Sequence, residues 1–366
     1  MDKTKEILID KLIISALDNN VFPGASIGFS QWTGSGYERF TKHYGYSQLT
    51  PEKKLLKITD FFDLASLTKP LVTTLILLYL LENKSLTFRT TLAELFPFCP
   101  PDKMGITIEE LMSHSSGFPA HRPYFQELLN FSEAERQGVL LTKILAEKLS
   151  AEPGKIHCYS DIGFILLGII IEKITGKNLY ELAGSIIYTP LKLQKELIFA
   201  SVNKDRGNVY VCTEKCLWDH KMLCGKVHDD NCRAIGGVAG HAGLFGTLYG
   251  VITLCEHLLN QWQGRERHPA YTNKILRRVM TRVKGSTWTL GFDTPSEQGS
   301  SSGTLFSKRS VGHLGFTGTS FWIDLEKECI AVLLTNRVHP TRENEKIRQF
   351  RPLFHNTLME GIIKGN

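Results

Sequence analysis

A serine and a lysine stand three residues apart where an irregular segment runs into a long apolar stretch. Ser66 and Lys69 lie in the segment 61–70, and residues 71–81 are mostly apolar. The apolar run predicts a buried helix, and positions i and i+3 of a helix share one face. The hydroxyl of Ser66 would then lie beside the ammonium of Lys69, next to unpaired N–H groups of the first turn. This arrangement suits a nucleophile, because a cation eases alkoxide formation and a free N–H binds an oxyanion.

The Ser-x-x-Lys pattern alone is common, and a plain helix N-terminus is the alternative for Ser66. The pattern recurs at Ser201 and Lys204, in a polar stretch with no apolar run behind it. Residues 24–28 match the G-x-S-x-G elbow of α/β-hydrolases, which needs a strand before it and a helix after it. Here a helix is predicted before the motif and a strand after it, so we expect Ser26 to be an ordinary strand residue.

Length and charge narrow the possible functions. With 366 residues the chain exceeds one comfortable core, so we expect two sub-domains packed as one body. The formal charge of +6 is mild and dispersed, which argues against a nucleic-acid partner. A modest positive field would suit a substrate that ends in a carboxylate.

The N-terminus shows no apolar core followed by a small-residue cleavage site, so no export signal is predicted. The longest apolar runs, 71–81 and 162–171, are too short to span a bilayer. The eight cysteines are then expected to be free thiols in a reducing compartment. These features predict a cytoplasmic protein, although a start codon further upstream would change that prediction.

The order of elements predicts an α+β fold. Strand patterns near both ends enclose a mainly helical middle. We therefore expect a mixed α/β domain of residues 1–66 and 284–366, with a central antiparallel sheet flanked by N- and C-terminal helices. Residues 67–283 would form a mainly helical domain, with the active site in the cleft between the two. The predicted helices are 4–18, 69–81, 92–96, 106–112, 140–149, 162–174, 247–261, 273–283 and 345–363, and the predicted strands are 25–31, 37–44, 287–292, 320–324 and 328–335.

A second chemical motif is Tyr159-Ser160-Asp161, which follows a loop and precedes an apolar helix. A tyrosine at such a turn beside Lys69 can act as a general base, because a nearby cation favours the phenolate. The similar tripeptide at 271–273 lies in a polar stretch and is a weaker candidate.

The third motif is the glycine-rich segment 312–319, which contains His313 and opens the strand 320–324. A cation on a glycine-rich strand edge can bind a substrate carboxylate, and the glycines let a ligand lie along the backbone. His241 in the segment 240–243 has a similar setting but precedes a helix. For either histidine, ordinary packing in the core is the alternative.

In this order and with these flanks, the motifs resemble the serine β-lactamase and penicillin-binding protein family. The resemblance is to class C β-lactamases, D-alanyl-D-alanine carboxypeptidases and related esterases, and it covers residues 20 to about 340. The matching pieces are Ala65-Ser66-Leu67-Thr68-Lys69, Leu111-Met112-Ser113-His114-Ser115-Ser116-Gly117, Pro153-Gly154, Tyr159-Ser160-Asp161, the helix to Gly176, Val227-His228-Asp229, residues 236–245, His313-Leu314-Gly315-Phe316-Thr317-Gly318-Thr319 and residues 335–340.

The resemblance implies a role for each matched catalytic position. Ser66 would be acylated, Lys69 would assist proton transfer, and Tyr159 would act as the base and then as the acid for the leaving group. Asp161 would contact the substrate amide. The resemblance implies neither a metal nor another cofactor.

It also implies the substrate-binding positions. His313 would face the substrate carboxylate, and Gly315, Phe316 and Thr317 would line the substrate, with the N–H groups of Ser66 and Phe316 forming the oxyanion hole. Two residues depart from the family pattern. Asp161 replaces the commoner Asn, which exchanges an amide donor for an acceptor. We therefore expect Asp161 to disfavour β-lactam hydrolysis and to suit a substrate with an extra donor.

The second departure is Leu314, which replaces the usual Thr or Ser and deletes a hydroxyl that would help to hold the carboxylate. The main prediction is thus a serine hydrolase that forms an acyl-enzyme, most similar to a D-Ala-D-Ala carboxypeptidase. The expected partner is a small molecule or peptide with a terminal carboxylate. The alternatives are a promiscuous esterase and a penicillin-binding or regulatory module with slow turnover.

A separate series of cysteines and histidines recurs at every fourth position between 212 and 232. Zinc binding is one interpretation, since thiolates and imidazoles are zinc ligands. The spacing matches no known zinc finger, and Gly225 would interrupt a helix, so free thiols are the expected state. The series comprises Cys212, Cys216, His220, Cys224, His228 and Cys232.

Overall fold

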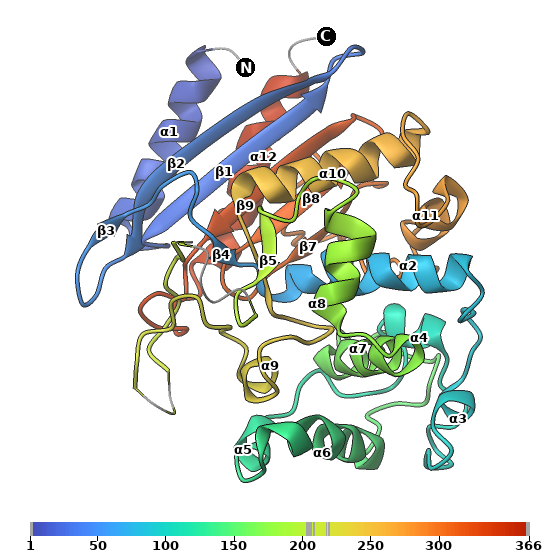
Figure 1. Ribbon diagram of the computed structural model, residues 1–366. Helices are drawn as coiled ribbons and strands as arrows, with labels where there is room; N and C mark the ends of the chain where they lie inside the picture. The colour runs from blue at the N-terminus through green and yellow to red at the C-terminus, as the bar shows by residue number, and fades with distance from the viewer. Residues whose placement is uncertain (1–2, 203–206, 208, 217, 219, 364–366) are drawn as a thin grey trace.

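The structure is a computed structural model that describes residues 3–202, 207, 209–216, 218 and 220–363, with side chains up to 360 (Figure 1). Its centre is a six-stranded antiparallel sheet in the order β3-β2-β1-β9-β8-β7. Helix α10 crosses one face of this sheet, and α1 and α12 cover the other (Figure 1). The bounds are α1 Lys3–Asp18, β1 Gly24–Trp32, β2 Tyr37–Gln48, β3 Lys54–Leu55, α10 Leu248–Gln263, β7 Val311–Leu314, β8 Ser320–Asp324, β9 Cys329–Thr335 and α12 Ile347–Ile363.

Strand β9 shows why this sheet forms from both ends of the chain. Its side chains alternate between two apolar layers: Ala331 and Leu333 pack with α1 and α12, whereas Val332 and Leu334 pack on the side of α10. A strand buried on both faces reads as a continuous apolar run. It pairs with β1, so that Ala25 lies opposite Thr335. The predicted antiparallel sheet with terminal helices is therefore confirmed.

The helical part lies beside the lower edge of the sheet in Figure 1. Its core helix runs through η2 and α2 and is almost wholly buried. By length and composition alone, one helical stretch of the described residues, Ala65–Glu82, could cross a membrane, but 83% of it is buried inside the fold. The bounds are η1 Ala65–Leu67, η2 Lys69–Thr74, α2 Leu75–Glu82, α3 Leu92–Leu95, α4 Ile108–Met112, α5 Phe125–Leu128, α6 Glu133–Ala146, α7 Asp161–Thr175, α8 Leu179–Leu182, η3 Ala183–Tyr188, α9 Asp230–Ala234 and α11 Asn273–Val279.

A second, three-stranded sheet carries the chain into the Ser66 segment. Its order is β4-β6-β5, with β4 at Phe62–Asp63, β5 at Leu197–Phe199 and β6 at Leu244–Gly246. These strands were not predicted, because each is too short to show a period in the sequence. They bring the end of the helical middle against the segment that leads into the helix after Ser66.

Several predicted elements need correction. The expected strand 287–292 is absent, and only a single bridge joins Trp288 to Asp293. Residues 311–314 form a separate strand, β7, which the sequence analysis had treated as the entry to the next strand. Ser26 lies within β1, as predicted. In the second Ser-x-x-Lys copy, Asn203 and Lys204 lie outside the described residues.

The prediction that all cysteines are free thiols is wrong for two of them. Cys212 and Cys224 form a disulfide. The segment is a hairpin and not a helix: the N–H of Thr213 donates to Leu223 O at 2.8 Å, and Lys215 bridges Met222. A hairpin places Cys212 opposite Cys224, so the spacing of four residues does not reflect a helix here. Among the described residues no group of three or more His, Cys, Asp or Glu side chains is placed to hold a metal ion.

Candidate active site

Ser66 lies on a tight elbow between β4 and the core helix. The preceding residue, Ala65, has φ of +47°, a left-handed conformation that side chains disfavour. The carboxylate of Asp63 accepts the Ala65 N–H at 2.9 Å, and the Thr68 hydroxyl donates to Ala65 O at 2.7 Å, so both sides of the strained residue are held. The helix then begins as a 3-10 turn followed by a π-helix. Strain of this kind often marks functional sites.

Lys69 is fully buried, at 0% exposure, directly beside the Ser66 hydroxyl. Its ammonium donates to Ser66 Oγ at 3.0 Å, to Asp161 Oδ1 at 2.7 Å and to the backbone oxygen of His241 at 3.3 Å. All three N–H donors are therefore used. Burial lowers the pKa of Lys69, but the charges of Asp161 and Tyr159 outweigh burial and leave that pKa above its ordinary value. At neutral pH, Lys69 is an ammonium.

Tyr159 lies beside Lys69, half-buried in the wall of the same pocket as Ser66. The Lys69 ammonium lies 4.9 Å from the centre of its ring. Burial raises the pKa of Tyr159, the positive charge of Lys69 lowers it only in part, and the negative charge of Asp161 raises it further. The resting side chain is thus a phenol, and Lys69 is placed to stabilise the phenolate when it forms.

Asp161 is the first residue of helix α7, and each of its two carboxylate oxygens has a partner. One oxygen accepts from Lys69, and the other lies 3.6 Å from Nδ1 of His121. Burial raises the pKa of Asp161, but Lys69 and His121 outweigh it, so this pKa lies far below its ordinary value. Hydrogen bonding to Asp161 raises the pKa of His121. His121 was not predicted as a site residue, although it follows the matched tract 111–117 by only four residues.

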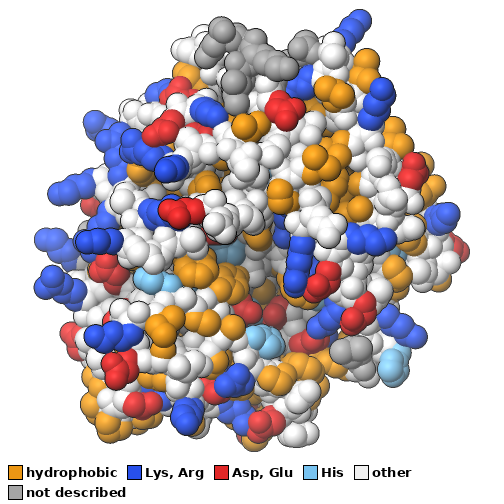
Figure 2. Space-filling model, turned by 180° about the vertical axis from the view of Figure 1, so that it is seen from behind, with side chains coloured by type: hydrophobic (Ala, Val, Ile, Leu, Met, Phe, Trp, Pro, Cys, Tyr) orange, Lys and Arg blue, Asp and Glu red, His pale blue; other side chains and the backbone are white. Residues whose placement is uncertain are grey.

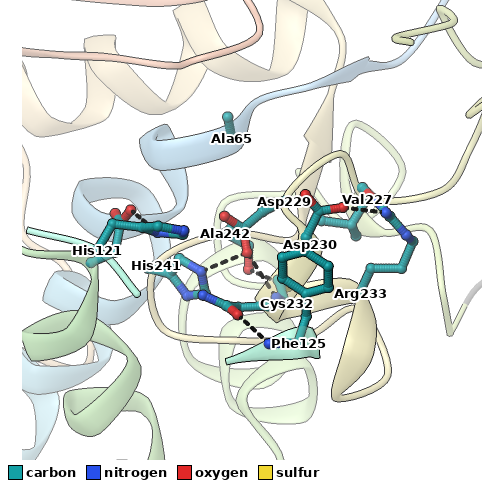
Figure 3. A network of polar contacts seen from close by, with 12 residues as sticks. Ala65, His121, Phe125, Val227, Asp229, Asp230, Cys232, Arg233, His241 and Ala242 are labelled. Carbon is teal, nitrogen blue, oxygen red and sulfur yellow. Dashed lines mark hydrogen bonds and ion pairs between the residues drawn. The ribbon is translucent and has the colours of Figure 1, made fainter. Parts of the chain in front are cut away.

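Behind Lys69, a second carboxylate and a histidine fix the loop that contributes a backbone oxygen. Figure 3 shows Asp229 and His241 pointing toward each other, and their side chains are 2.9 Å apart. Asp229 also accepts the N–H of Cys232, which caps α9. Burial raises the pKa of Asp229, but His241 outweighs it and holds the value at about 2. His241 therefore packs in the fold, as the alternative in the sequence analysis held.

The turn 315–319 lies against the elbow. The hydroxyl of Thr317 donates to Asp63 O at 2.7 Å, and that of Thr319 donates to Leu64 O at 3.1 Å. A side chain on Gly315 would meet the Thr319 hydroxyl at 2.0 Å, so only glycine fits there. The hydroxyl of Thr317 is thus committed to the fold, which leaves its backbone as the part that a substrate can reach.

Two N–H groups are candidates for an oxyanion hole. Neither the Ser66 N–H nor the Phe316 N–H has a hydrogen-bond partner within the described part of the chain. Hydrogen bonds from Thr317 and Thr319 tie their two segments together. The ring of Phe316 is 51% exposed and lines the pocket. The predicted pair of donors is thus free to bind a developing negative charge.

His313 lines the pocket from β7, but its charge differs from the sequence-based expectation. Burial and the nearby Lys69 lower its pKa to about 3. Its Nδ1 lies 2.9 Å from Leu314 O, which fits a neutral ring that donates from this nitrogen. His313 is therefore uncharged at neutral pH, and it lacks the positive charge expected of a carboxylate-binding residue.

Four arginines that were not predicted from the sequence line the pocket. The cavity measures about 630 Å³. Arg351 donates to Gly315 O and Thr319 O, both at 2.7 Å, and Arg337 donates to Phe316 O at 2.8 Å. Neither has a carboxylate within 4 Å among the described residues. On the face shown in Figure 2, basic, acidic and histidine side chains gather around a central hollow. The four arginines are Arg337, Arg342, Arg348 and Arg351.

Known proteins match this chain in sequence and in fold. The Beta-lactamase family model matches residues 9–354. An Escherichia coli (strain K12) protein named "Putative D-alanyl-D-alanine carboxypeptidase" is 28% identical over 335 residues, covering 83% of this chain and 76% of that protein. An octameric penicillin-binding protein homologue from Pyrococcus abyssi has a TM-score of 0.74 at 17% identity, covering 99% of this chain and 78% of the other. EstCE1, a hydrolase with promiscuous acyltransferase activity, has a TM-score of 0.71 at 18% identity, covering 96% and 99%.

The two structural neighbours share the fold, in which an antiparallel sheet packs with helices. The family match spans nearly the whole described chain and includes the Ser66 elbow, the Tyr159 loop and the turn 315–319. The protein belongs to the Beta-lactamase family.

Proposed function

We propose that this protein is a serine hydrolase that forms an acyl-enzyme on Ser66, with the specificity of a D-Ala-D-Ala carboxypeptidase. The observation that carries the proposal is the 3.0 Å hydrogen bond from the buried Lys69 ammonium to Ser66 Oγ, beside two unpartnered N–H groups. A hydroxyl held by a cation next to an oxyanion site is placed for acyl transfer.

The residues divide the chemistry in two halves. In the first, the phenol of Tyr159 loses its proton to solvent, and the phenolate is stabilised by the Lys69 ammonium. Ser66 Oγ then bonds to the substrate carbonyl carbon while its own proton passes to the phenolate oxygen. The carbonyl oxygen takes the negative charge and is bound by the N–H groups of Ser66 and Phe316. When the C–N bond breaks, Tyr159 gives the proton to the leaving amine. In the second half, water attacks the acyl carbon and gives a proton to Tyr159. The ester bond to Ser66 then breaks, Tyr159 returns the proton to Ser66 Oγ, and the acid is released.

A substrate with a terminal carboxylate fits the charge of the pocket. Arg337 and Arg351 bond only to backbone carbonyls, so each can add an anionic partner without losing an ion pair. The printed name of the Escherichia coli relative points to the same class of substrate. If the chain acts in the cytoplasm, as its sequence predicts, then precursor or recycled muropeptides and small D-amino-acid peptides are suitable substrates.

Intact-protein mass spectrometry tests the proposal. The protein is incubated separately with a penicillin and with an acyl-D-Ala-D-Ala peptide, and D-Ala release is followed in parallel. We expect a mass increase on Ser66 with the penicillin and catalytic release of D-Ala from the peptide, both lost in Ser66→Ala. A stable adduct without multiple turnover would instead indicate a penicillin-binding module with slow turnover.

A promiscuous esterase is the second candidate, and the state of His313 favours it. The neutral His313 and the apolar Leu314 form an uncharged surface in the pocket. An ester whose leaving group has no carboxylate can lie against this surface. Rapid hydrolysis of p-nitrophenyl esters without release of D-Ala would support this candidate over the carboxypeptidase.

A further inference from the structure

His114 occupies a backbone position that glycine usually takes. It follows α4 with φ of +58°. The N–H of Ser115 donates to Glu110 O at 2.9 Å, and the N–H of His114 approaches Leu111 O at 3.4 Å. These two contacts form a Schellman motif with His114 at the left-handed position. A residue with a side chain is strained there, whereas glycine is not.

The chain gains a specific set of contacts from this strained histidine. Nδ1 of His114 accepts the Ser160 N–H at 3.1 Å, and its backbone oxygen accepts the Cys158 N–H at 2.8 Å. The two residues that flank Tyr159 in the chain are therefore both held through their backbone N–H groups by His114. The imidazole also packs 4.7 Å from the Tyr159 ring, centre to centre.

Further packing holds the imidazole in place. Its ring lies 5.2 Å from Phe164 and 5.6 Å from Trp288, and His114 is only 2% exposed. Burial lowers the pKa of His114 well below its ordinary value, so the ring stays neutral and Nδ1 stays an acceptor.

We propose that His114 is a positioning residue that fixes the phenol of Tyr159 against Ser66 and Lys69. This inference rests on the proposed function, in which Tyr159 carries the proton. Strain at a single residue is retained where the surrounding structure gains from it, and here the gain is the orientation of the Tyr159 loop. A misplacement of about 1 Å in such a group lowers rates about 100-fold.

Lys84 offers a matched control, because it has the same backbone motif away from the pocket. Its φ is +57°, and Ser85 N–H donates to Leu80 O at 3.0 Å while Lys84 N–H approaches Leu81 O at 3.3 Å. Lys84 is exposed, whereas His114 is buried. Lys84→Gly therefore relieves the same strain without touching Tyr159.

The experiment compares His114→Gly, His114→Asn and Lys84→Gly in the full chain. Asparagine tolerates the left-handed conformation and places Oδ1 near the position of Nδ1, so it keeps the acceptor. We expect His114→Gly to slow penicillin acylation of Ser66 about 10- to 100-fold with little change in the half-saturating penicillin concentration. His114→Asn should recover to within about threefold, and Lys84→Gly should match the wild type.

Hydrogen exchange followed by mass spectrometry gives a readout that needs no activity. The Ser160 amide should exchange faster in His114→Gly and stay protected in His114→Asn. Unchanged acylation and exchange in His114→Gly, or an asparagine variant as slow and as unprotected as glycine, would overturn the inference. Absence of acylation in the wild type would instead count against the proposed function, and the exchange comparison would still decide the role of His114.

Discussion

The charged side chains in the two walls of the pocket have different kinds of partner. On the catalytic wall, Lys69 and Asp161 meet each other directly, and Asp229 meets His241. On the wall formed by the turn 315–319 and helix α12, Arg351 is held by carbonyl oxygens alone. The charges of the first wall are already paired without a ligand, whereas Arg351 on the second wall can still pair with an anionic ligand.

The difference separates chemistry from recognition. Buried charges that are paired within the protein keep a fixed geometry, which the transfer of a proton requires. Charges that are held only by dipoles keep their full attraction for an anion. Changes on the first wall should therefore alter the rate of acylation, and changes on the second should alter the affinity for carboxylates.

The largest effect is expected for Lys69→Ala. Acylation of Ser66 by a penicillin should slow about 10³-fold, because both the cation beside the nucleophile and the support for the phenolate are lost. The free energy of unfolding should also fall by about 3 kcal/mol, since Asp161 loses its main partner in a buried site. Stopped-flow acylation and urea unfolding measure the two effects. Lys11→Ala, at an exposed site on α1, is the control and should change neither.

Arg351→Met tests the other wall. The KM for an acyl-D-Ala-D-Ala peptide should rise about 10- to 100-fold, the range expected for the loss of a charge-assisted hydrogen bond, while kcat changes little. Steady-state kinetics with a p-nitrophenyl ester that has no carboxylate provide the control. Equal loss with both substrates would mean that Arg351 only shapes the turn 315–319.

Asp161→Asn should shift the pH dependence of acylation. Burial raises the pKa of Tyr159 and Asp161 raises it further, so the rate should climb with pH as the phenolate forms. Removing the negative charge lowers the pKa of Tyr159 and also that of Lys69, which moves the rise to lower pH. Turnover of a β-lactam at pH 7 should increase about fivefold, measured by ultraviolet absorbance. Little or no change would contradict the proposed influence of Asp161.

Leu314→Thr is expected to have the smallest effect. It restores the hydroxyl that family members commonly have next to His313, and one added hydrogen bond should lower the KM for a carboxylate substrate about threefold. The ester without a carboxylate should react as before. A lower KM for both substrates would show that the hydroxyl does not act through the carboxylate.

The elements with a clear period were predictable, and those defined by distant partners were not. Helix α7 and strands β8 and β9 have long apolar patterns, and the structure has them close to their predicted bounds. The expected strand 287–292 had the right residue types, but only one bridge forms there. The strands of the small sheet are two or three residues long, so no local pattern could reveal them.

For the site, the motifs that resemble the family fell into one pocket, since Ser66 and Tyr159 both line it. The missed residues come from segments with no motif of their own, such as Arg351 near the start of α12. The charge of His313 was mispredicted because burial, which lowers its pKa, depends on packing that the local sequence does not show. The pairing of Cys212 with Cys224 was not predicted, because a spacing of four residues suggested a helix where the chain forms a hairpin.

The pairing of β1 with β9 has a consequence for how the protein is made. Strand β1 acquires its inner neighbour only after about 300 further residues have been synthesised, because Ala25 pairs with Thr335. Until then, β1 and β2 expose an open edge in the nascent chain, and Phe316 has not yet joined the Ser66 elbow. Translation therefore delays assembly of a reactive cleft until the ribosome approaches the final helix, so prematurely terminated chains should carry the nucleophile without the means to use it.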